Sequence, residues 1–303
     1  MTARDIAVDK NITPWFKGMM TVDMSKPGAQ EYYNSLIQLY ANWGIDFIKI
    51  DGISFNPFSP DEIEGYKKAI QKTGRDIVLS LSPGPAPVKH APFFNEHAHM
   101  WRMSSDVWDS WFYIDRTFTL CEKWNKHRSE GCWPDADMLC LGNIGIRSEI
   151  AEINGNGKYF GTGRYTRLSK DEQFTMMSLW AMFKSPLFFG GNLPDNDEFT
   201  KKLITNSDLI YINQYSTNNQ QLLKTKHLRV WVADCAGKKN KYVAIFNVSN
   251  EEQTFYIPKR KFSTAGFSRI TNIWTNKPVE LLNGEAGGVI PSHGVLLIKL
   301  SND

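Results

Sequence analysis

The chain has 303 residues, which is enough for one large domain or two of medium size. Its 35 Lys and Arg residues are nearly balanced by 32 Asp and Glu residues, and with no long basic cluster this charge argues against a nucleic-acid partner. No stretch reaches the ~18 consecutive apolar residues of a membrane-spanning helix. A content of 42% hydrophobic and 13% aromatic residues excludes a disordered chain.

Up to about residue 205 the chain alternates short apolar runs with helical patterns, which is typical of βα units around a parallel sheet. Pro27 and Gly44 mark the ends of the first helix, and Ser169 with Glu172 forms a capping box at the start of a later one. The predicted helices are 28–43, 59–73, 107–126, 169–183 and 197–204. The predicted strands are 45–51, 76–82, 99–103, 137–141 and 186–190.

From about residue 220 the pattern becomes alternation without helices. The predicted strands there are 228–233, 242–248, 253–258, 267–272, 278–282 and 294–300. Turn residues between them indicate a small antiparallel β-sandwich. We therefore expect two domains, residues 1–218 and residues 219–303.

Polar residues follow the predicted parallel strands, where an active site would be built. Phe47, Lys49 and Asp51 share one face of the first strand. A lysine within an apolar strand is costly to bury unless a carboxylate or a ligand compensates its charge. The alternatives are therefore a structural Lys49–Asp51 pair and a functional site.

Further charged residues fall at the ends of later strands. Asp106 follows the third strand, four residues after Arg102, and Asp135 and Asp137 lie in the next region. Two carboxylates at one edge of a sheet are what glycosidic hydrolysis needs, one as the nucleophile and one as a proton donor about 5–5.5 Å away in a retaining enzyme. A nearby Lys or Arg would favour the ionised form of the nucleophile.

These residues lie in segments that resemble glycoside hydrolase family 27, the melibiase-type α-galactosidases and α-N-acetylgalactosaminidases. The motifs occur in one order and cover nearly the whole chain, with an opening at 22–33 that is similar to the bacterial members. They are Trp43-Gly-Ile-Asp-Phe-Ile-Lys-Ile-Asp51-Gly, Gly65-Tyr-Lys with Thr73-Gly-Arg-Asp-Ile-Val, Met100-Trp-Arg102 with Asp106, Trp133-Pro-Asp-Ala-Asp137-Met-Leu, Leu179-Trp-Ala with Ser185-Pro-Leu-Phe, and Asn206-Ser-Asp-Leu-Ile-Tyr-Ile-Asn213-Gln214.

The resemblance implies an α/β fold, a (β/α)₈ TIM-type barrel followed by a C-terminal antiparallel β-sandwich. It also implies a retaining mechanism without metal or organic cofactor, a carbohydrate substrate, and a periplasmic or secreted full-length protein. Asp51 matches the nucleophile and Asp106 the acid/base. The expected substrate-binding residues are Lys49, Arg102, Ser82, Trp133, Asp135 and Asp137.

The chain departs from the family pattern at three places. The match begins just ahead of the fourth barrel strand, so we expect equivalents of strands 4–8 and not of strands 1–3. Ser82 stands where α-galactosidases often carry a Glu that reads the 2-hydroxyl, which leaves room at C2. Ile53 replaces a cysteine that is frequent in eukaryotic members.

Several alternatives stay open. The sequence leaves three sugars open as the substrate: galactose, N-acetylgalactosamine and β-L-arabinopyranose. It also leaves the oligomeric state open, and a homo-oligomer is one of the alternatives. The alternative from another functional class is an inactive remnant of a barrel that binds glycans without hydrolysing them. His97-Ala-His99 fits a metal-binding motif on a strand, but such a site needs a further Lys and two more His at the ends of later strands. The other histidines lie at 90, 127, 227 and 293 and do not fit this pattern, so we interpret His97 and His99 as surface or core residues.

Overall fold

The computed structural model describes residues 2–8, 20–145, 163–236, 240–257, 267–279, 281–282 and 285–302. Contacts within the chain divide it into two compact units, Met1–Asp106 with Lys126–Asp137, and Val107–Asn125 with Met138–Asp303. This division follows packing, and the border expected between residues 218 and 219 stays a prediction. In the described part of the chain, no helix is both long enough and apolar enough to cross a membrane.

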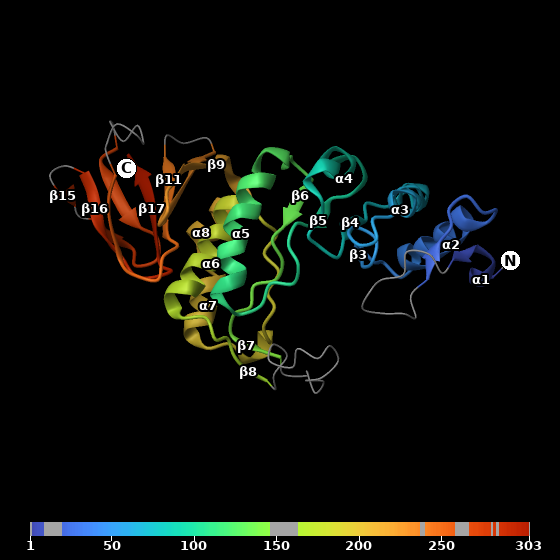
Figure 1. The fold of residues 1–303 in the computed structure, drawn as a ribbon, viewed down its shortest axis with the longest axis horizontal. Helices are drawn as coiled ribbons and strands as arrows, with labels where there is room; N and C mark the ends of the chain where they lie inside the picture. Colours follow the sequence, from blue (N-terminus) through green and yellow to red (C-terminus); the bar gives the residue numbers. More distant parts are fainter. Residues whose placement is uncertain are drawn as a thin grey trace. The chain divides into compact units, whose positions relative to one another are not determined.

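The elements appear in Figure 1 with their labels. In chain order they are α1 (Ala3–Ile6), β1 (Ala7–Val8), β2 (Thr21–Val22), α2 (Ala29–Asn42), β3 (Phe47–Ile50), α3 (Pro60–Thr73), β4 (Val78–Leu81), η1 (Val88–His90), α4 (Ala91–His97), β5 (Met100–Arg102), α5 (Trp111–Trp124), η2 (Asn125–His127), β6 (Trp133–Asp135), β7 (Asn143–Ile144), β8 (Arg164–Tyr165), α6 (Lys170–Phe183), η3 (Leu193–Asp195), α7 (Glu198–Ile204), α8 (Ser207–Tyr215), β9 (Ser216–Lys224), β10 (Leu228–Cys235), β11 (Lys241–Asn247), β12 (Gln253–Ile257), β13 (Arg269–Asn272), β14 (Lys277–Pro278), β15 (Leu281–Leu282), β16 (Glu285–Ile290) and β17 (Val295–Ser301).

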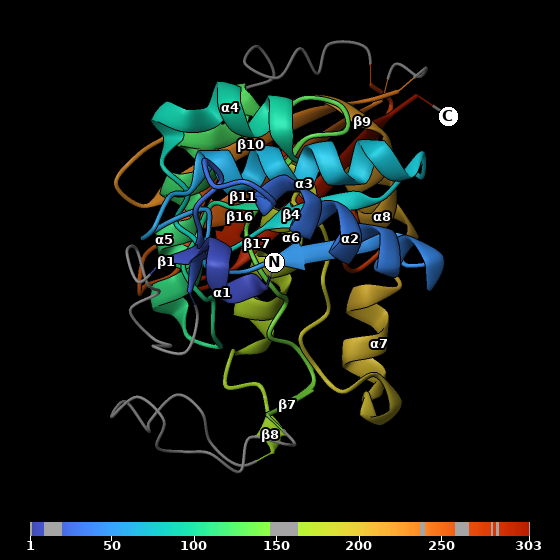
Figure 2. The same cartoon turned by 90° about the vertical axis from the view of Figure 1, so that its right-hand side faces the viewer.

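The first unit is built on a four-stranded parallel sheet in the order β3-β4-β5-β6. Helices α2 and α3 lie side by side (Figure 2). Gly44, which was expected to end α2, has left-handed backbone, and so does Gly74, which follows α3. The βα alternation predicted for this part of the chain is therefore confirmed.

The register of this sheet decides which side chains share a face. Ile50, Leu81, Trp101 and Pro134 are neighbours across the four strands. Trp101 stacks on Phe94 of α4, so this row faces the helices. The residues one position before and after each member therefore point to the opposite face.

Two predicted strands are not strands in the structure. In place of 137–141 the structure has β6 at Trp133–Asp135, and the segment predicted as a strand at 186–190 contributes only the isolated parallel bridge between Phe189 and Leu139. A proline such as Pro134 argues against a central strand when only the sequence is considered, because it cannot donate a backbone hydrogen bond. In the structure, Trp133 N–H donates to His99 O, and Asp135 O accepts from Met103 N–H. Pro134 lies between these two residues, at a position where the backbone nitrogen donates no hydrogen bond to β5.

The second unit contains the predicted antiparallel sandwich. Six strands form one sheet in the order β14-β13-β17-β11-β10-β9, and β12-β16-β15 form another. Their shared core contains Val243, Ile245, Ile298, Phe255 and Ile290, which are all buried. The sequence prediction missed α8, β9 and β16, and residues 258 and 280 of two predicted strands lie outside the described residues.

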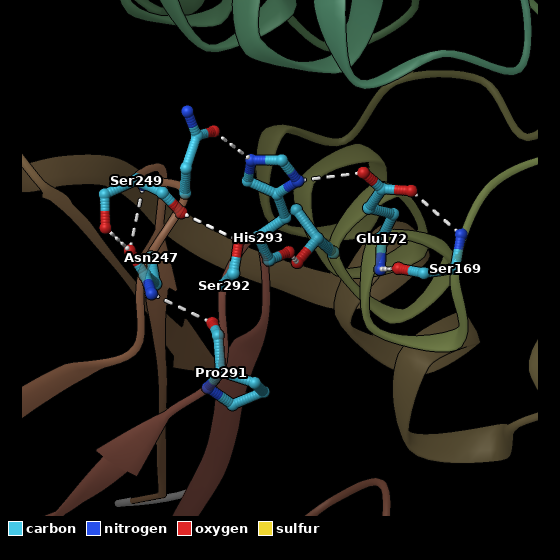
Figure 3. Close-up of polar contacts among 9 residues, drawn as sticks. Ser169, Glu172, Asn247, Ser249, Pro291, Ser292 and His293 are labelled. Carbon is cyan, nitrogen blue, oxygen red and sulfur yellow. Dashed lines mark hydrogen bonds and ion pairs between the residues drawn. The ribbon is translucent and has the colours of Figure 1, made fainter.

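Within this unit a histidine joins the sandwich to α5 and α6 (Figure 3). His293 Nδ1 lies 2.8 Å from Glu172 Oε1, its Nε2 lies 3.0 Å from Asn250 Oδ1, and its ring stacks on Trp111. Glu172 also accepts a hydrogen bond from Ser169 N–H, so the predicted capping box is confirmed. The cap of α6 and the sandwich are thus held by the same carboxylate.

Candidate active site

The predicted site residues come together at the end of the parallel sheet of the first unit. Asp51 directly follows β3 and Ser82 directly follows β4, while Arg102 and Asp135 are the last residues of β5 and β6. Ser82 N–H donates to Ile50 O (2.8 Å), and Arg102 is the register partner of Asp135. We call this row of Asp51, Ser82, Arg102 and Asp135 the rim. It lies at the carboxyl ends of the strands, where barrel enzymes place their chemistry.

Arg102 is the centre of the charges at the rim. Its side chain is 4% exposed, and its Nη2 lies 2.8 Å from Asp137 Oδ2 and 3.2 Å from Asp106 Oδ1. The Asp137 side chain is buried, whereas that of Asp106 is 66% exposed. One buried cation therefore serves a buried carboxylate and an exposed one, and the exposed carboxylate can meet a substrate.

Asp135 is buried next to this cluster. Its Oδ1 accepts a hydrogen bond from Asp137 N–H at 2.8 Å, and Asp137 has a left-handed backbone with φ +84°. Burial raises the pKa of Asp135 to about 6, and the nearby charges of Arg102 and Lys49 only partly oppose this. Asp135 is therefore shielded from water, as Asp137 is, whereas Asp51 and Asp106 are exposed.

This raised pKa predicts a pH dependence of stability. Between about pH 4 and pH 6 the folded protein holds a proton on Asp135 that the unfolded chain has released, so the free energy of unfolding falls as the pH rises. The shift from 3.8 to about 6 corresponds to roughly 3 kcal/mol at most. Asp135→Asn cannot titrate, and its free energy of unfolding should fall less over this window.

Urea unfolding of the wild type and of Asp135→Asn at pH 4.5 and pH 7 measures this difference. The pKa of Glu62 is also raised by burial and contributes a slope of the same sign to both proteins, so only the difference between them is informative. Parallel curves for the two proteins would contradict an elevated pKa at Asp135.

Lys49 and Asp51 lie on the exposed part of the site. Both residues are exposed, and among the described residues no ion pair or hydrogen bond joins them. The alternative of a purely structural Lys49–Asp51 pair therefore finds no support. The electrostatic influence of Lys49 reaches Asp135 on the far strand of the sheet instead.

Ser82 and Trp133 occupy different depths. Ser82 is buried at the rim, and its carbonyl accepts a hydrogen bond from Ile53 N–H, which ties the turn after β3 to the end of β4. Trp133 is half-buried at the start of β6, two residues from the rim, on the same face as Asp135. Ser82 thus lies level with Asp51, and Trp133 lies deeper along the sheet.

The sequence analysis missed two serines of the site. Ser80 is the register partner of Lys49 and is buried, and its Oγ has no hydrogen-bond partner among the described residues. Ser104 Oγ donates to Ala136 O at 3.1 Å and so ties the segment after β5 to the segment after β6. The period-2 spacing of Ser80 and Ser82 was a signal that could have identified the first of them.

The His97-Ala-His99 motif lies away from the rim. His97 stacks on Phe93, and His99 Nδ1 accepts a hydrogen bond from Leu79 N–H. Both histidines line a cavity of about 610 Å³ beside the start of β4 and β5, which contains none of the predicted site residues. Among the described residues no group of three or more His, Cys, Asp or Glu side chains has a geometry that could hold a metal ion.

Comparison with known proteins adds the family context. The family described as "Alpha galactosidase A" (Melibiase_2) matches residues 17–155, and "Alpha galactosidase C-terminal beta sandwich domain" (Melibiase_C) matches residues 225–300. Human α-galactosidase A is 30% identical over 225 residues, covering 70% of this chain and 47% of that protein. The α-N-acetylgalactosaminidase of Gallus gallus is 29% identical over 189 residues, covering 58% of this chain and 41% of that protein. The chain spans about half the length of the curated relatives it matches.

Among solved structures, a GH27 β-L-arabinopyranosidase variant from Geobacillus stearothermophilus, in complex with arabinose, is 42% identical with a TM-score of 0.91. The match covers 99% of this chain and 68% of that one. Such GH27 structures have a TIM barrel followed by a β-sandwich, so the fold class expected from the sequence is confirmed.

Proposed function

The chain belongs to glycoside hydrolase family 27, and from this membership we propose that the protein is a retaining exo-glycosidase acting on terminal α-linked galactose. The observation that carries the proposal is the rim itself. It sets the exposed carboxylate of Asp51 at the end of β3 and the exposed Asp106 beyond the end of β5, next to the buried Arg102. Two accessible carboxylates at one edge of a sheet are the groups that a glycosidase requires.

In the proposed mechanism Asp51 is the nucleophile. Its carboxylate forms a bond to the anomeric carbon as the bond from that carbon to the leaving oxygen breaks, and Asp106 gives its proton to that oxygen. Asp106 then takes a proton from water as the water oxygen attacks the same carbon. This second displacement releases the sugar with its original anomeric configuration and frees Asp51.

The charges around Arg102 support the role of Asp106. The shorter contact of Arg102 is with the buried Asp137 at 2.8 Å, and that carboxylate offsets most of its charge. The longer contact, at 3.2 Å, leaves the exposed Asp106 less strongly bound to the cation. Such an arrangement orients Asp106 while allowing it to gain and lose a proton in each cycle.

The sugar hydroxyls would be held by residues at and near the rim. They are Lys49, Ser82, Arg102, Trp133 and Asp137. The buried, small side chain of Ser82 supports a second specificity, because it leaves space beside C2 of the sugar. N-acetyl-α-galactosamine would use that space. β-L-Arabinopyranose presents the same ring hydroxyls as galactose, and the structural relative at 42% identity is an arabinopyranosidase.

A panel of p-nitrophenyl glycosides tests the proposal. We expect turnover of the α-galactoside, with α-galactose as the first product seen by NMR, and at least about 10³-fold lower kcat/KM on the α-glucoside, whose 4-hydroxyl is inverted. Preference for the N-acetyl-α-galactosaminide or the β-L-arabinopyranoside would assign the specificity to that sugar instead. Ser82→Glu should remove any N-acetylgalactosaminide activity by filling the space at C2. Binding of galactose without turnover of any substrate would favour a glycan-binding protein.

A further inference from the structure

The turn after β6 has an unusual backbone at a charged residue. Asp137 adopts a left-handed conformation, with φ +84°, which side chains other than Gly, Asn and Asp rarely adopt. The N–H of Asp137 donates to Oδ1 of Asp135, two residues earlier, at 2.8 Å. A side-chain acceptor at this spacing forms an Asx turn, which fixes the position of the Asp137 N–H, and an Asp such as Asp137 tolerates left-handed backbone. Asp135 is therefore part of the structure that holds Asp137.

This backbone conformation determines where the Asp137 carboxylate lies. Asp137 Oδ2 reaches Nη2 of Arg102 at 2.8 Å, and the same nitrogen lies 3.2 Å from Oδ1 of Asp106. Arg102 is buried and its Nε has no hydrogen-bond partner among the described residues, so its position depends strongly on the contacts of Nη2. The contacts run without a break from Asp135 through Asp137 and Arg102 to Asp106.

We propose that Asp135 is a positioning residue of the active site, which holds Asp137 in its left-handed conformation and through it places Arg102 beside Asp106. The proposal rests on the function proposed above, in which Asp106 is the acid/base. Asp135 itself is buried, so this role needs no contact with the sugar. It differs in this respect from the substrate-binding role that the sequence resemblance implies.

The role requires an oxygen acceptor at position 135 and not a negative charge. A protonated carboxyl or an amide still offers a carbonyl oxygen to the N–H of Asp137. The raised pKa of Asp135 agrees with this, because the group carries a proton through much of the range below neutral pH. The charged partner of Arg102 in this arrangement is Asp137, at 2.8 Å.

Two substitutions separate the acceptor from the charge. Asp135→Asn keeps an acceptor oxygen and should retain kcat within about threefold, with an unchanged pH-rate profile. Asp135→Ala removes the acceptor and should lower kcat on the order of 10²-fold, since misplacing catalytic groups by about 1 Å costs this much. KM should change far less than kcat, because the loss falls on the transition state.

Asp23→Ala is the matched control, since Asp23 Oδ1 accepts from Ser25 N–H in the same kind of turn of the same unit, and Asp23 is not one of the rim residues. It should leave kcat unchanged. Equal losses in Asp135→Ala and Asp135→Asn, or a shifted pH-rate profile in Asp135→Asn, would overturn the proposal, because either would show that the charge is needed.

Hydrogen exchange at the Asp137 amide gives a readout that does not depend on turnover. The amide should be protected in the wild type and in Asp135→Asn and should exchange faster in Asp135→Ala. If the wild type hydrolyses no glycoside, the proposed function fails while this measurement still tests the role of Asp135. An Asp137 amide that is equally protected in all three proteins would overturn that role. If Asp135→Ala does not fold, the activity and pH-rate profile of Asp135→Asn still decide between acceptor and charge.

Discussion

Asp51→Ala is expected to lower kcat for p-nitrophenyl α-galactoside by at least about 10³-fold, because the reaction loses the group that forms the covalent intermediate. Asp51 is exposed and forms no ion pair among the described residues, so its removal should change the free energy of unfolding little. Stopped assays of the purified variant beside the wild type, with urea unfolding of both, provide the measurement.

Chemical rescue distinguishes loss of the nucleophile from general damage. Added azide should restore part of the turnover of Asp51→Ala by forming a bond to the anomeric carbon as the aryl oxide leaves, giving a β-galactosyl azide. Asp46→Ala is the control, since Asp46 precedes the same strand at its other end and pairs with Arg75. Undiminished activity in Asp51→Ala would remove Asp51 from the proposed mechanism.

Arg102→Leu is expected to cost about 3–5 kcal/mol of stability, because it leaves the buried carboxylate of Asp137 without its partner. It should also abolish turnover in the fraction that remains folded, since Asp106 loses the cation that orients it. Arg102→Lys retains the charge but not the planar guanidinium, and its effect should be intermediate. Urea unfolding and initial rates on the α-galactoside measure the two effects.

Arg75→Leu provides the matched comparison in the same unit. Arg75 also pairs with an aspartate, Asp46, but that carboxylate is 77% exposed, and exposed pairs contribute about 1 kcal/mol or less. If Arg102→Leu were no less stable than Arg75→Leu, the pair with Asp137 would not be the buried interaction described here.

Local signals were sufficient for most helices of the chain. The capping box of Ser169 and Glu172 starts α6 where predicted, and Gly74 ends α3, because these signals act within a few residues. Strands depend on partners far along the chain and were less predictable. Strand β6 was displaced in the prediction because the position of Pro134 relative to β5 cannot be read from its own segment.

The local pattern predicted that Asp51, Ser82 and Arg102 reach the rim, because each lies at the end of a predicted short strand and the ends of parallel strands meet at one edge. Asp135 reaches the rim as the last residue of β6, whose position was not predicted. The family motifs supplied the proposed roles of Asp51 and Asp106. The alternation of strands and helices indicated a parallel sheet and the change of pattern near residue 220 indicated a β-sandwich, while the barrel was implied by the family resemblance.

The burial and the charge pairing of these groups appear only in the folded protein. It shows Arg102 shared between a buried and an exposed carboxylate, and Asp135 buried and bonded to the backbone of Asp137. Burial and charge pairing arise from the register between strands that lie far apart in the chain, and local sequence does not encode that register. The physical difference between Asp135 and Asp106, one held away from water and one open to it, therefore appears only after the sheet is assembled.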